Sequence, residues 1–404
     1  MRMSKKKELV PKFRFPKYVN SEQWISTELS SLLDYERPDL YIVESDNYKN
    51  EGIPVLTANK SFILGYTDEK NNIYSRVPVI IFDDFTTEKK YVDFPFKVKS
   101  SAIKILKPKG NNVLKFVFEL MNTINFEAKE HKRYYISTYQ KLFVYVPKDV
   151  KEQQNIADCL SSTDDLIDAE SRKLKALEKY KKGLMQKLFP AEGKTLPEWR
   201  FPEFQDCEEW ETVKLEKLAL YRRGSFPQPY GLPEWYDEKS GMPFIQVFDV
   251  DDNMKLKSNT KNKISELAAQ QSVFIPKGTL IITIQGSIGR VAITQYDAYI
   301  DRTLLLFEKF FRKIDKTFLA YNLQLLFDIE KQKAPGGIIK TITKQALSEF
   351  LTSIPRIEEQ EKIAGCLSEV DTMITEQSNK VEQLKAHKKG LMQGLFPSLE
   401  EADV

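Results

Sequence analysis

Apolar residues recur with a heptad rhythm along two long stretches of the chain. In the first, from Glu152 to about Leu188, the rhythm is carried by Ile156, Leu160, Thr163, Ile167, Leu174, Leu177, Leu184 and Leu188. In the second it is carried by Ile363, Leu367, Val370, Ile374, Val381, Leu384, Leu391 and Leu395. This spacing predicts a long helix with one apolar seam. We therefore expect two helices, each about 55 Å long.

Charge is polarised along both predicted helices. Residues 151–170 hold six acids and one base, whereas residues 171–190 hold one acid and seven bases. Residues 356–376 hold six acids and two bases, and residues 380–397 hold one acid and four bases. The helix dipole explains part of this polarity. We predict an antiparallel intramolecular coiled coil with pseudo-twofold symmetry, because it would set acidic halves against basic halves and cover both seams.

The chain contains two copies of one unit, a variable domain followed by a helical segment. Residues 181–190 read KKGLMQKLFP, and residues 388–397 read KKGLMQGLFP. Residues 11–16 read PKFRFP, and residues 197–202 read PEWRFP. Between these matches the copies differ in sequence and length. Plain duplication with drift would explain the repeat, but the divergence stops sharply at Pro147 and Pro355. This pattern favours a constant scaffold that carries two different binding surfaces.

Both variable domains are expected to mix helices and strands, so the predicted fold class is α+β. In the first domain we predict strands at 77–82, 102–106 and 142–146 and a helix at 113–121. In the second we predict strands at 241–250, 279–284, 291–294 and 303–307 and a helix at 317–327. The predicted organisation is a first recognition domain at 1–150, a helical region at 151–190, a second recognition domain at 191–353 and a helical region at 354–404.

Composition narrows the class of protein without identifying a partner. The 404 residues are enough for two or more domains. No apolar run approaches the roughly 18 residues of a membrane span, and no secretory signal is evident, so a cytoplasmic protein is expected. The three cysteines lack metal-ligand spacing. A net charge of +3 is too small to indicate a nucleic-acid partner by itself.

Basic and aromatic residues interleave around predicted loops of both domains. Lys and Arg could contact phosphates, and Arg, Asn and Gln could contact base edges. Any one of these side chains is more simply a solvated surface residue, but as a group they indicate DNA binding. The candidates are Lys89, Lys90, Lys97, Lys99, Arg133, Tyr134, Arg222, Arg223, Lys255, Lys257, Lys261, Ser287, Arg290 and Lys340.

Catalytic motifs are missing from the sequence. There is no phosphate loop with Lys-Ser/Thr, no Asn/Asp-Pro-Pro-aromatic motif for amino methylation, and no nucleophile elbow around Ser287. His131 and His387 are the only histidines. We therefore predict a non-catalytic binding component with no metal or cofactor of its own.

The combined pattern resembles the DNA-specificity subunits of type I restriction–modification enzymes over essentially the whole chain. It consists of the R-F-P…W domain openings, the Ile-Ala-x-Cys-Leu helix starts followed by Asp164 or Asp371, and the KKGLMQ(K/G)LFP helix ends. The second domain adds Gly-Ser-Ile-Gly-Arg at 286–290, for which the first domain has no clear counterpart.

The resemblance implies that each variable domain binds one half of an interrupted, asymmetric DNA target. It also implies that the helical regions bind methyltransferase subunits, two copies being expected, and that restriction subunits can join. The S-adenosylmethionine, ATP and Mg²⁺ of such complexes would then belong to the partner subunits. The implied helix-pair and partner interface comprises Ile156, Leu160, Ile167, Leu174, Leu177, Leu184, Ile363, Leu367, Ile374, Val381, Leu384 and Leu391.

Two alternatives remain open at this stage. The chain could serve a related system whose partner fuses methylation and cleavage, or it could be a coiled-coil scaffold with protein-binding heads. DNA binding that falls steeply with salt and varies with sequence would separate DNA recognition from the scaffold.

Overall fold

The chain folds into two compact units that have the same kinds of parts. The computed structural model describes residues 10–59, 61–333 and 342–397. Unit 1 comprises residues 1–171 and 379–404, and unit 2 comprises residues 172–378. Each unit therefore contains one mixed domain and one half of each long helix, α2 (Val150–Leu188) and α7 (Ile357–Leu395). The predicted helices agree with these bounds to within a few residues.

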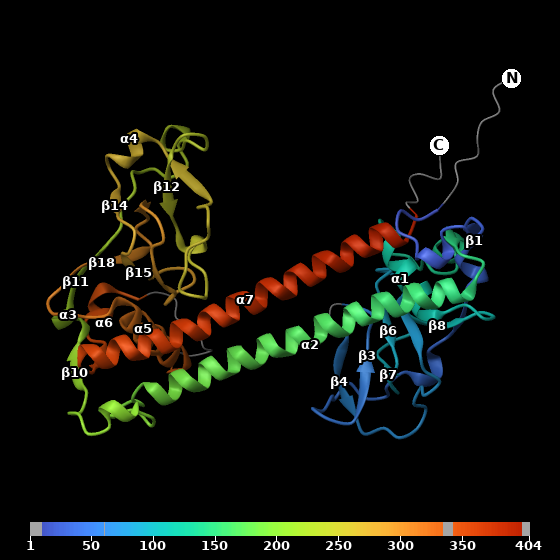
Figure 1. Cartoon of the computed structure of the whole chain (residues 1–404), viewed down its shortest axis with the longest axis horizontal. Helices are drawn as coiled ribbons and strands as arrows, with labels where there is room; N and C mark the ends of the chain where they lie inside the picture. Colours follow the sequence, from blue (N-terminus) through green and yellow to red (C-terminus); the bar gives the residue numbers. More distant parts are fainter. Residues whose placement is uncertain (1–9, 60, 334–341, 398–404) are drawn as a thin grey trace. The chain divides into compact units, whose positions relative to one another are not determined.

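Unit 1 contains three small sheets and one short helix (Figure 1). Strand β1 (Ile25–Glu28) pairs with β9 (Phe143–Val146). The four-stranded sheet has the order β2 (Leu33–Glu36), β8 (Ile103–Pro108), β5 (Val79–Asp83), β6 (Lys89–Val92). The third sheet has the order β4 (Ile63–Thr67), β3 (Ile53–Leu56), β7 (Lys97–Val98), in which β3 and β7 run parallel. Helix α1 spans Leu114–Thr123.

Unit 2 repeats this topology with one additional strand. Strand β10 (Glu211–Lys214) pairs with β19 (Leu351–Ile354). The next sheet has the order β11 (Ala219–Arg223), β18 (Leu304–Phe310), β15 (Leu280–Thr283), β16 (Val291–Ile293). The third has the order β13 (Asn262–Ile264), β12 (Met242–Ile245), β17 (Ala298–Ile300), β14 (Val273–Ile275). The helices are α3 (Leu215–Leu218), α4 (Glu266–Ala269), α5 (Lys316–Lys333) and α6 (Lys344–Ser348).

The predicted α+β class is correct, and most of the predicted elements are present. The exception is 241–250, which was expected to be one strand. It is a strand only as far as Ile245, and a short 3₁₀ turn follows at Val247–Asp249. Gln246 and Asp249 form a capping box around this turn. The side chain of each residue accepts a hydrogen bond from the backbone amide of the other, so these amides do not continue the strand. Twelve strands within the described residues were not predicted, and each of them is five residues long or shorter. They are β1, β2, β3, β4, β6, β7, β10, β11, β13, β14, β17 and β19.

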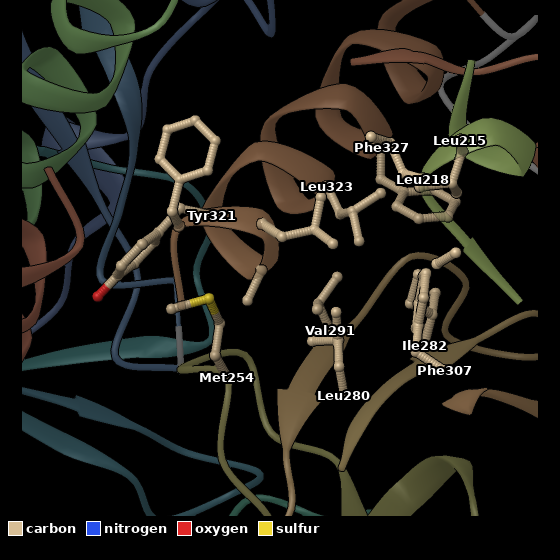
Figure 2. Packing of buried hydrophobic residues seen from close by; sticks show 14 of the residues in the cluster. Leu215, Leu218, Met254, Leu280, Ile282, Val291, Phe307, Tyr321, Leu323 and Phe327 are labelled. Carbon is tan, nitrogen blue, oxygen red and sulfur yellow. The ribbon is translucent and has the colours of Figure 1, made fainter. Parts of the chain in front are cut away.

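Apolar packing joins the helix and the sheet within unit 2. Figure 2 shows Leu323 and Phe327 of α5 pointing toward Leu280, Ile282 and Val291 of the β11-β18-β15-β16 sheet. All five side chains are buried. This cluster also contains residues from the end of α2 and the start of α7, so the core of the domain is continuous with the helix pair inside unit 2.

The duplicated sequence motifs form one duplicated contact. In unit 1, Arg14 of the R-F-P opening donates two hydrogen bonds of 2.8 Å to the Glu152 carboxylate, and Trp24 Nε1 donates to Glu152 Oε1 at 3.3 Å. The corresponding bonds in unit 2, at 2.8, 2.7 and 3.3 Å, join Arg200, Glu359 and Trp210. Both glutamates lie in the first turn of a long helix and are buried, so the motif fixes the domain opening to the helix start.

Within each unit the two long helices run antiparallel. In unit 1, Asp164 pairs with Lys388 at 2.6 Å and Glu170 pairs with Lys380 at 2.5 Å, so residue numbers rise on one helix as they fall on the other. The counterpart of the first pair in unit 2 is the 2.6 Å pair of Lys181 with Asp371. Acidic and basic side chains thus pair across the two helices within each unit.

Candidate nucleic-acid interface

Three loops of unit 2 converge at one end of its sheets. They are 246–252 after β12 (the β12 loop), 284–290 between β15 and β16 (the β15–β16 turn) and 301–303 after β17 (the β17 loop). One hollow of about 310 Å³ and a second of about 620 Å³ lie among them and share Val247 and Phe248 as walls. The first is also lined by Tyr230, Gln246, Gln285, Asp301, Arg302 and Thr303. The loops therefore form a continuous concave surface with polar and aromatic side chains.

Backbone geometry holds the β15–β16 turn. The Thr283 hydroxyl donates to the Ser287 carbonyl at 2.5 Å and accepts from the Arg290 amide at 3.0 Å. Gly289 has a φ of +79°, and a Cβ there would lie 2.6 Å from the Phe327 ring. Only glycine fits both requirements, because the backbone is left-handed and the α5 ring packs against it. The turn is therefore set against the core and presents Ser287 outward.

A buried carboxylate shapes the β12 loop. Asp249 accepts hydrogen bonds from the amides of Gln246 at 2.8 Å and Lys261 at 2.9 Å. It is fully buried, and burial raises the pKa of its carboxyl above the ordinary range. Asp249 thus ties the start of the loop to the segment that precedes β13. This brings the Lys261 ammonium to 5.0 Å from the centroid of the Phe248 ring.

The predicted contacts of unit 2 fall into two groups. Arg290 lies at the interface but pairs with Asp252 at 2.8 Å and donates to the Val250 carbonyl at 2.9 Å, so it positions neighbouring loops. Arg222 on β11 pairs with Glu308 at 2.5 Å. The remaining described candidates are exposed, and these are Arg223, Lys255, Lys257, Lys261 and Ser287. Lys340 lies outside the described residues.

Unit 1 presents the equivalent three loops with different side chains. They are 57–59 after β3 (the β3 loop), 84–88 between β5 and β6 (the β5–β6 turn) and 99–102 after β7 (the β7 loop). The Asp83 carboxylate accepts from the amides of Phe85 and Thr86, both at 2.9 Å, which closes the turn. His131 stacks on the Phe85 ring at 4.7 Å between centroids. The β5–β6 turn therefore takes the place of the Gly-Ser-Ile-Gly-Arg turn that the sequence of unit 1 lacks.

A buried ion pair lies at the start of the β5–β6 turn. Lys104 Nζ lies 3.0 Å from Asp84 Oδ2, and both side chains are almost completely buried. Asp84 Oδ1 also accepts from the Tyr135 amide at 2.7 Å. The segment that carries His131 and Arg133 is therefore fastened to the β5–β6 turn, with the Arg133 guanidinium 5.9 Å from the Phe85 ring centroid.

Two predicted contacts of unit 1 are wrong, because their side chains lie inside the domain. Lys97 is buried and forms an ion pair with Glu69. Tyr134 is buried, and its hydroxyl donates to the Glu130 carbonyl at 2.9 Å. Neither presents a polar group to a ligand.

The other candidates of unit 1 remain available to different degrees. Arg133 is exposed, and Lys90 is half-buried. Lys89 is half-buried beside the Tyr139 ring, and burial lowers the pKa of its ammonium. Lys99 at the β7 loop forms an ion pair with Asp46. The candidates of unit 1 therefore differ in how far their charged groups are open to a ligand.

Comparison with known proteins agrees with this architecture. Residues 207–386 match the type I restriction modification DNA specificity domain. A type I restriction enzyme specificity subunit of Escherichia coli is 29% identical over 371 residues, which is 87% of each chain. A putative type I specificity subunit of Methanocaldococcus jannaschii is 28% identical over 60% of this chain and 56% of its own length.

The second half of the chain thus resembles a type I DNA specificity domain, and the chain as a whole is similar to type I restriction–modification specificity subunits. A solved structure of a type I S subunit from M. genitalium has the same fold, with a TM-score of 0.65 and 16% identity, and covers 97% of this chain and 100% of that one. A second type I structure superposes with a TM-score of 0.57 over 93% of this chain.

The apolar seams of the two long helices are covered. All twelve predicted seam residues are buried or half-buried. Leu166 and Met373, which occupy equivalent places on the two helices, are instead 45% and 50% exposed. One exposed apolar side chain therefore remains at the same place on each long helix.

Sequence reasoning missed several residues of the candidate interface in unit 2. Gln246, Gln285, Arg302 and Tyr230 line the smaller hollow although none lies in a basic cluster. The available signal was positional, because Gln246 follows β12 and Arg302 follows β17, and these two strands are parallel neighbours. Parallel neighbours end at the same edge of a sheet, so the residues after them must lie close together.

The described residues also lack two kinds of feature, a metal-binding cluster and a membrane-spanning helix. No group of three or more His, Cys, Asp or Glu side chains is arranged there to hold a metal ion. Within 10–59, 61–333 and 342–397, no helix is long and apolar enough to cross a membrane.

Proposed function

We propose that this chain recognises a two-part, asymmetric DNA sequence and directs a partner adenine methyltransferase to it. The observation that carries the proposal is the repetition of three convergent loops on one topology with different side chains in the two units. Phe85 and Thr86 stand in unit 1 where unit 2 offers Gln285 and Gly286. Two different surfaces on a repeated scaffold suit two different half-sites.

The proposal extends to the assembly. The long helices would bind two methyltransferase subunits, one for each duplicated face, and restriction subunits would join that complex. S-adenosylmethionine, ATP and Mg²⁺ would be bound by those partners in the cytoplasm. The exposed Leu166 and Met373 support this view, because equivalent apolar positions on both helices suit two copies of the same partner.

Exchange of one domain tests the proposal. Residues 20–146 would be replaced by the corresponding segment of another specificity subunit, and methylated positions would be mapped across a genome in cells that also contain the methyltransferase. We expect one half of the target to change and the other half to persist. A change in both halves, or methylation that does not depend on this chain, would contradict the proposal.

The purified proteins provide a second measurement. The chain alone should incorporate no labelled methyl groups into DNA, and addition of the methyltransferase subunit should confer methylation at the mapped sequence only. Binding should fall steeply as salt increases, because Lys and Arg contacts to phosphates release counterions. Affinity that is independent of both salt and sequence would favour a protein scaffold instead.

A further inference from the structure

The smaller hollow of unit 2 is lined by an arginine that stacks on an aromatic ring and has no carboxylate partner among the described residues. The Arg302 guanidinium lies 5.1 Å from the centroid of the Tyr230 ring. Arg302 is exposed, and in the described part of the chain it forms no ion pair with a carboxylate. Arg222 and Arg290 differ, because each pairs with an acid of its own unit. A guanidinium stacked on a ring keeps its N–H edge available for another acceptor.

A buried carboxylate fixes the ring that carries this arginine. Tyr230 donates its hydroxyl to Asp301, which is 2% exposed. The same carboxylate accepts from the Thr303 amide at 2.9 Å and from the Thr303 hydroxyl at 2.5 Å. The Asp301 amide donates to the Ile245 carbonyl at 3.0 Å, which anchors the β17 loop to β12. Tyr230 and Asp301 thus form a rigid support beneath the guanidinium.

The rest of the hollow offers further donors beside apolar walls. Gln246 uses its side-chain oxygen inside the protein, where it accepts from Asn262 Nδ2 at 2.6 Å. Its amide nitrogen therefore remains as a donor at the surface. Val247 and Phe248 form the walls. Apolar walls suit the edge of a base pair better than a phosphate, which is charged on all sides.

We propose that Arg302, positioned by Tyr230 and Asp301, is the residue with which unit 2 recognises a guanine of its half-site. This inference rests on the proposed function. The major-groove edge of guanine presents two acceptors, O6 and N7, which match the two N–H groups of a guanidinium edge. In unit 1, Ser100 stands at the place of Arg302. It is preceded by Lys99, which pairs with Asp46. The proposed contact therefore belongs to one half of the target only.

Selection from a randomised duplex library tests the proposal, using the full chain in complex with its methyltransferase subunit. For the unaltered chain we expect a two-part sequence with one invariant G·C pair in the half read by unit 2. Arg302→Ala should reduce discrimination at that pair by about tenfold to a hundredfold and leave the other positions unchanged. Selection of the unit 1 half-site by the same molecules controls for folding.

Matched variants separate reading from support. Arg312→Gln removes an arginine that pairs with Glu211 away from the loops, and it should leave the selected sequence unchanged. Tyr230→Phe keeps the ring but removes the bond to Asp301, so it should lower discrimination at the same pair by a smaller factor. In the Arg302→Ala background, Tyr230→Phe should have no further effect on that pair if Tyr230 acts through Arg302.

Each outcome decides between the inference and the function on which it rests. If Arg302→Ala weakens binding to all sequences equally and lowers the salt dependence by about one ion, Arg302 contacts a phosphate and the inference is wrong. If the unaltered complex selects a two-part site and Arg302→Ala selects the same site with equal discrimination, only the inference fails. If the unaltered complex selects no sequence, the proposed function fails with it.

Discussion

The two units place opposite chemistries at one equivalent position. In unit 1, Asp84 and Lys104 form a buried ion pair beneath the β5–β6 turn. In unit 2 the register of strands β15 and β18 puts Ile284 and Leu305 at the same places, and both are buried in one apolar cluster. The same topology therefore tolerates either solution. A buried ion pair adds little net stability over an apolar pair, because desolvation offsets the attraction.

What the ion pair adds is a connection. Asp84 Oδ1 accepts from the Tyr135 amide, so the charged solution also fastens the segment that carries His131 and Arg133. In unit 2 the corresponding segment connects through a backbone bond of 3.4 Å from the Ile342 amide to the Ile284 carbonyl. The comparison indicates that the ion pair in unit 1 orders a candidate DNA-contacting segment.

A second difference lies where each domain meets the helix pair. In unit 1, Lys388 and Lys115 both contact Asp164, and Lys115 also pairs with the buried Glu119 at 2.8 Å. In unit 2 the equivalent aspartate, Asp371, contacts Lys181 and accepts from the Tyr321 hydroxyl at 2.6 Å. Unit 1 thus has a cluster of four charged side chains at the place where unit 2 has a group of three side chains, one of which is a neutral hydroxyl.

The largest expected effect comes from splitting the buried ion pair. Asp84→Ile leaves Lys104 buried without a counter-charge and should cost about 3–5 kcal/mol of unfolding free energy. Lys104→Leu should cost a similar amount. The double variant copies unit 2 and should lose only about 1–3 kcal/mol, since the Tyr135 amide then lacks its acceptor. Urea unfolding, with hydrogen exchange of residues 79–92 and 131–139, would measure these changes.

An exposed ion pair provides the control for these variants. Glu22→Gln breaks the exposed pair with Lys148 and should leave the unfolding curve unchanged. If the double variant is as unstable as either single variant, the two domains are not interchangeable at this position and the comparison between them fails.

Each of the two helix-facing groups holds a proton whose loss destabilises the fold in alkali. Burial disfavours the charged form of Lys115, but hydrogen bonds and charges from Glu119 and Asp164 outweigh burial and raise the pKa of Lys115 above its ordinary range. A raised lysine pKa stabilises the fold below about pH 10.4, and this contribution is lost as pH rises through the folded value. Glu119→Gln lowers the folded-state pKa of Lys115, so it should reduce stability at neutral pH and flatten the alkaline loss of stability.

In unit 2 the titrating group is a phenol. Burial, aided by the bond to Asp371, raises the pKa of Tyr321, so the folded state holds this proton more tightly and loses stability above about pH 10. Tyr321→Phe should cost about 1.5–3 kcal/mol at pH 7, because a bond to a charged group is lost, yet flatten the alkaline limb. Urea unfolding at pH 8, 10 and 11 would compare both variants with the parent chain. A variant whose stability falls as steeply with pH as that of the parent chain would contradict the role assigned to its group.

Periodicity predicted the helices well because their seams obey a local rule. The same periodicity could not identify the partners of Lys181 and Lys388, which are Asp371 and Asp164, because each partner comes from the other helix. Lys97 was misjudged for a similar reason. Its counter-charge, Glu69, lies 28 residues away, and nothing near Lys97 in sequence announces the pair.

Arg302 was missed because it stands alone between apolar strands and not in a basic cluster. Its importance comes from the parallel pairing of β12 and β17, which brings the β12 and β17 loops together. Long-range pairing of this kind leaves little local pattern in the sequence. Residues that depend on it become visible only once the sheet order is known.

The smallest expected effect concerns a glycine that differs between the copies. Gly394 lies near the end of α7 and has no side chain. A Cβ at this position would lie 2.0 Å from the Phe13 ring. The Phe13 amide donates to the Gly394 carbonyl at 2.8 Å. In unit 2, Lys187 and Trp199 make the same backbone bond at 2.9 Å, so a side chain is accepted at the equivalent position.

Gly394→Ala should therefore change stability by less than about 1 kcal/mol. Alanine gains up to about 1 kcal/mol in helix propensity, and displacement of Phe13 offsets this gain. The displacement is mild because Phe13 is 55% exposed and can rotate away. Hydrogen exchange of residues 10–18 should nevertheless accelerate, and the reverse change, Lys187→Gly, should lose about 1 kcal/mol without affecting residues 10–18. A loss above about 3 kcal/mol for Gly394→Ala would show that Phe13 packs against α7 far more tightly than Trp199 packs in unit 2, and that the two domain openings are not equivalent.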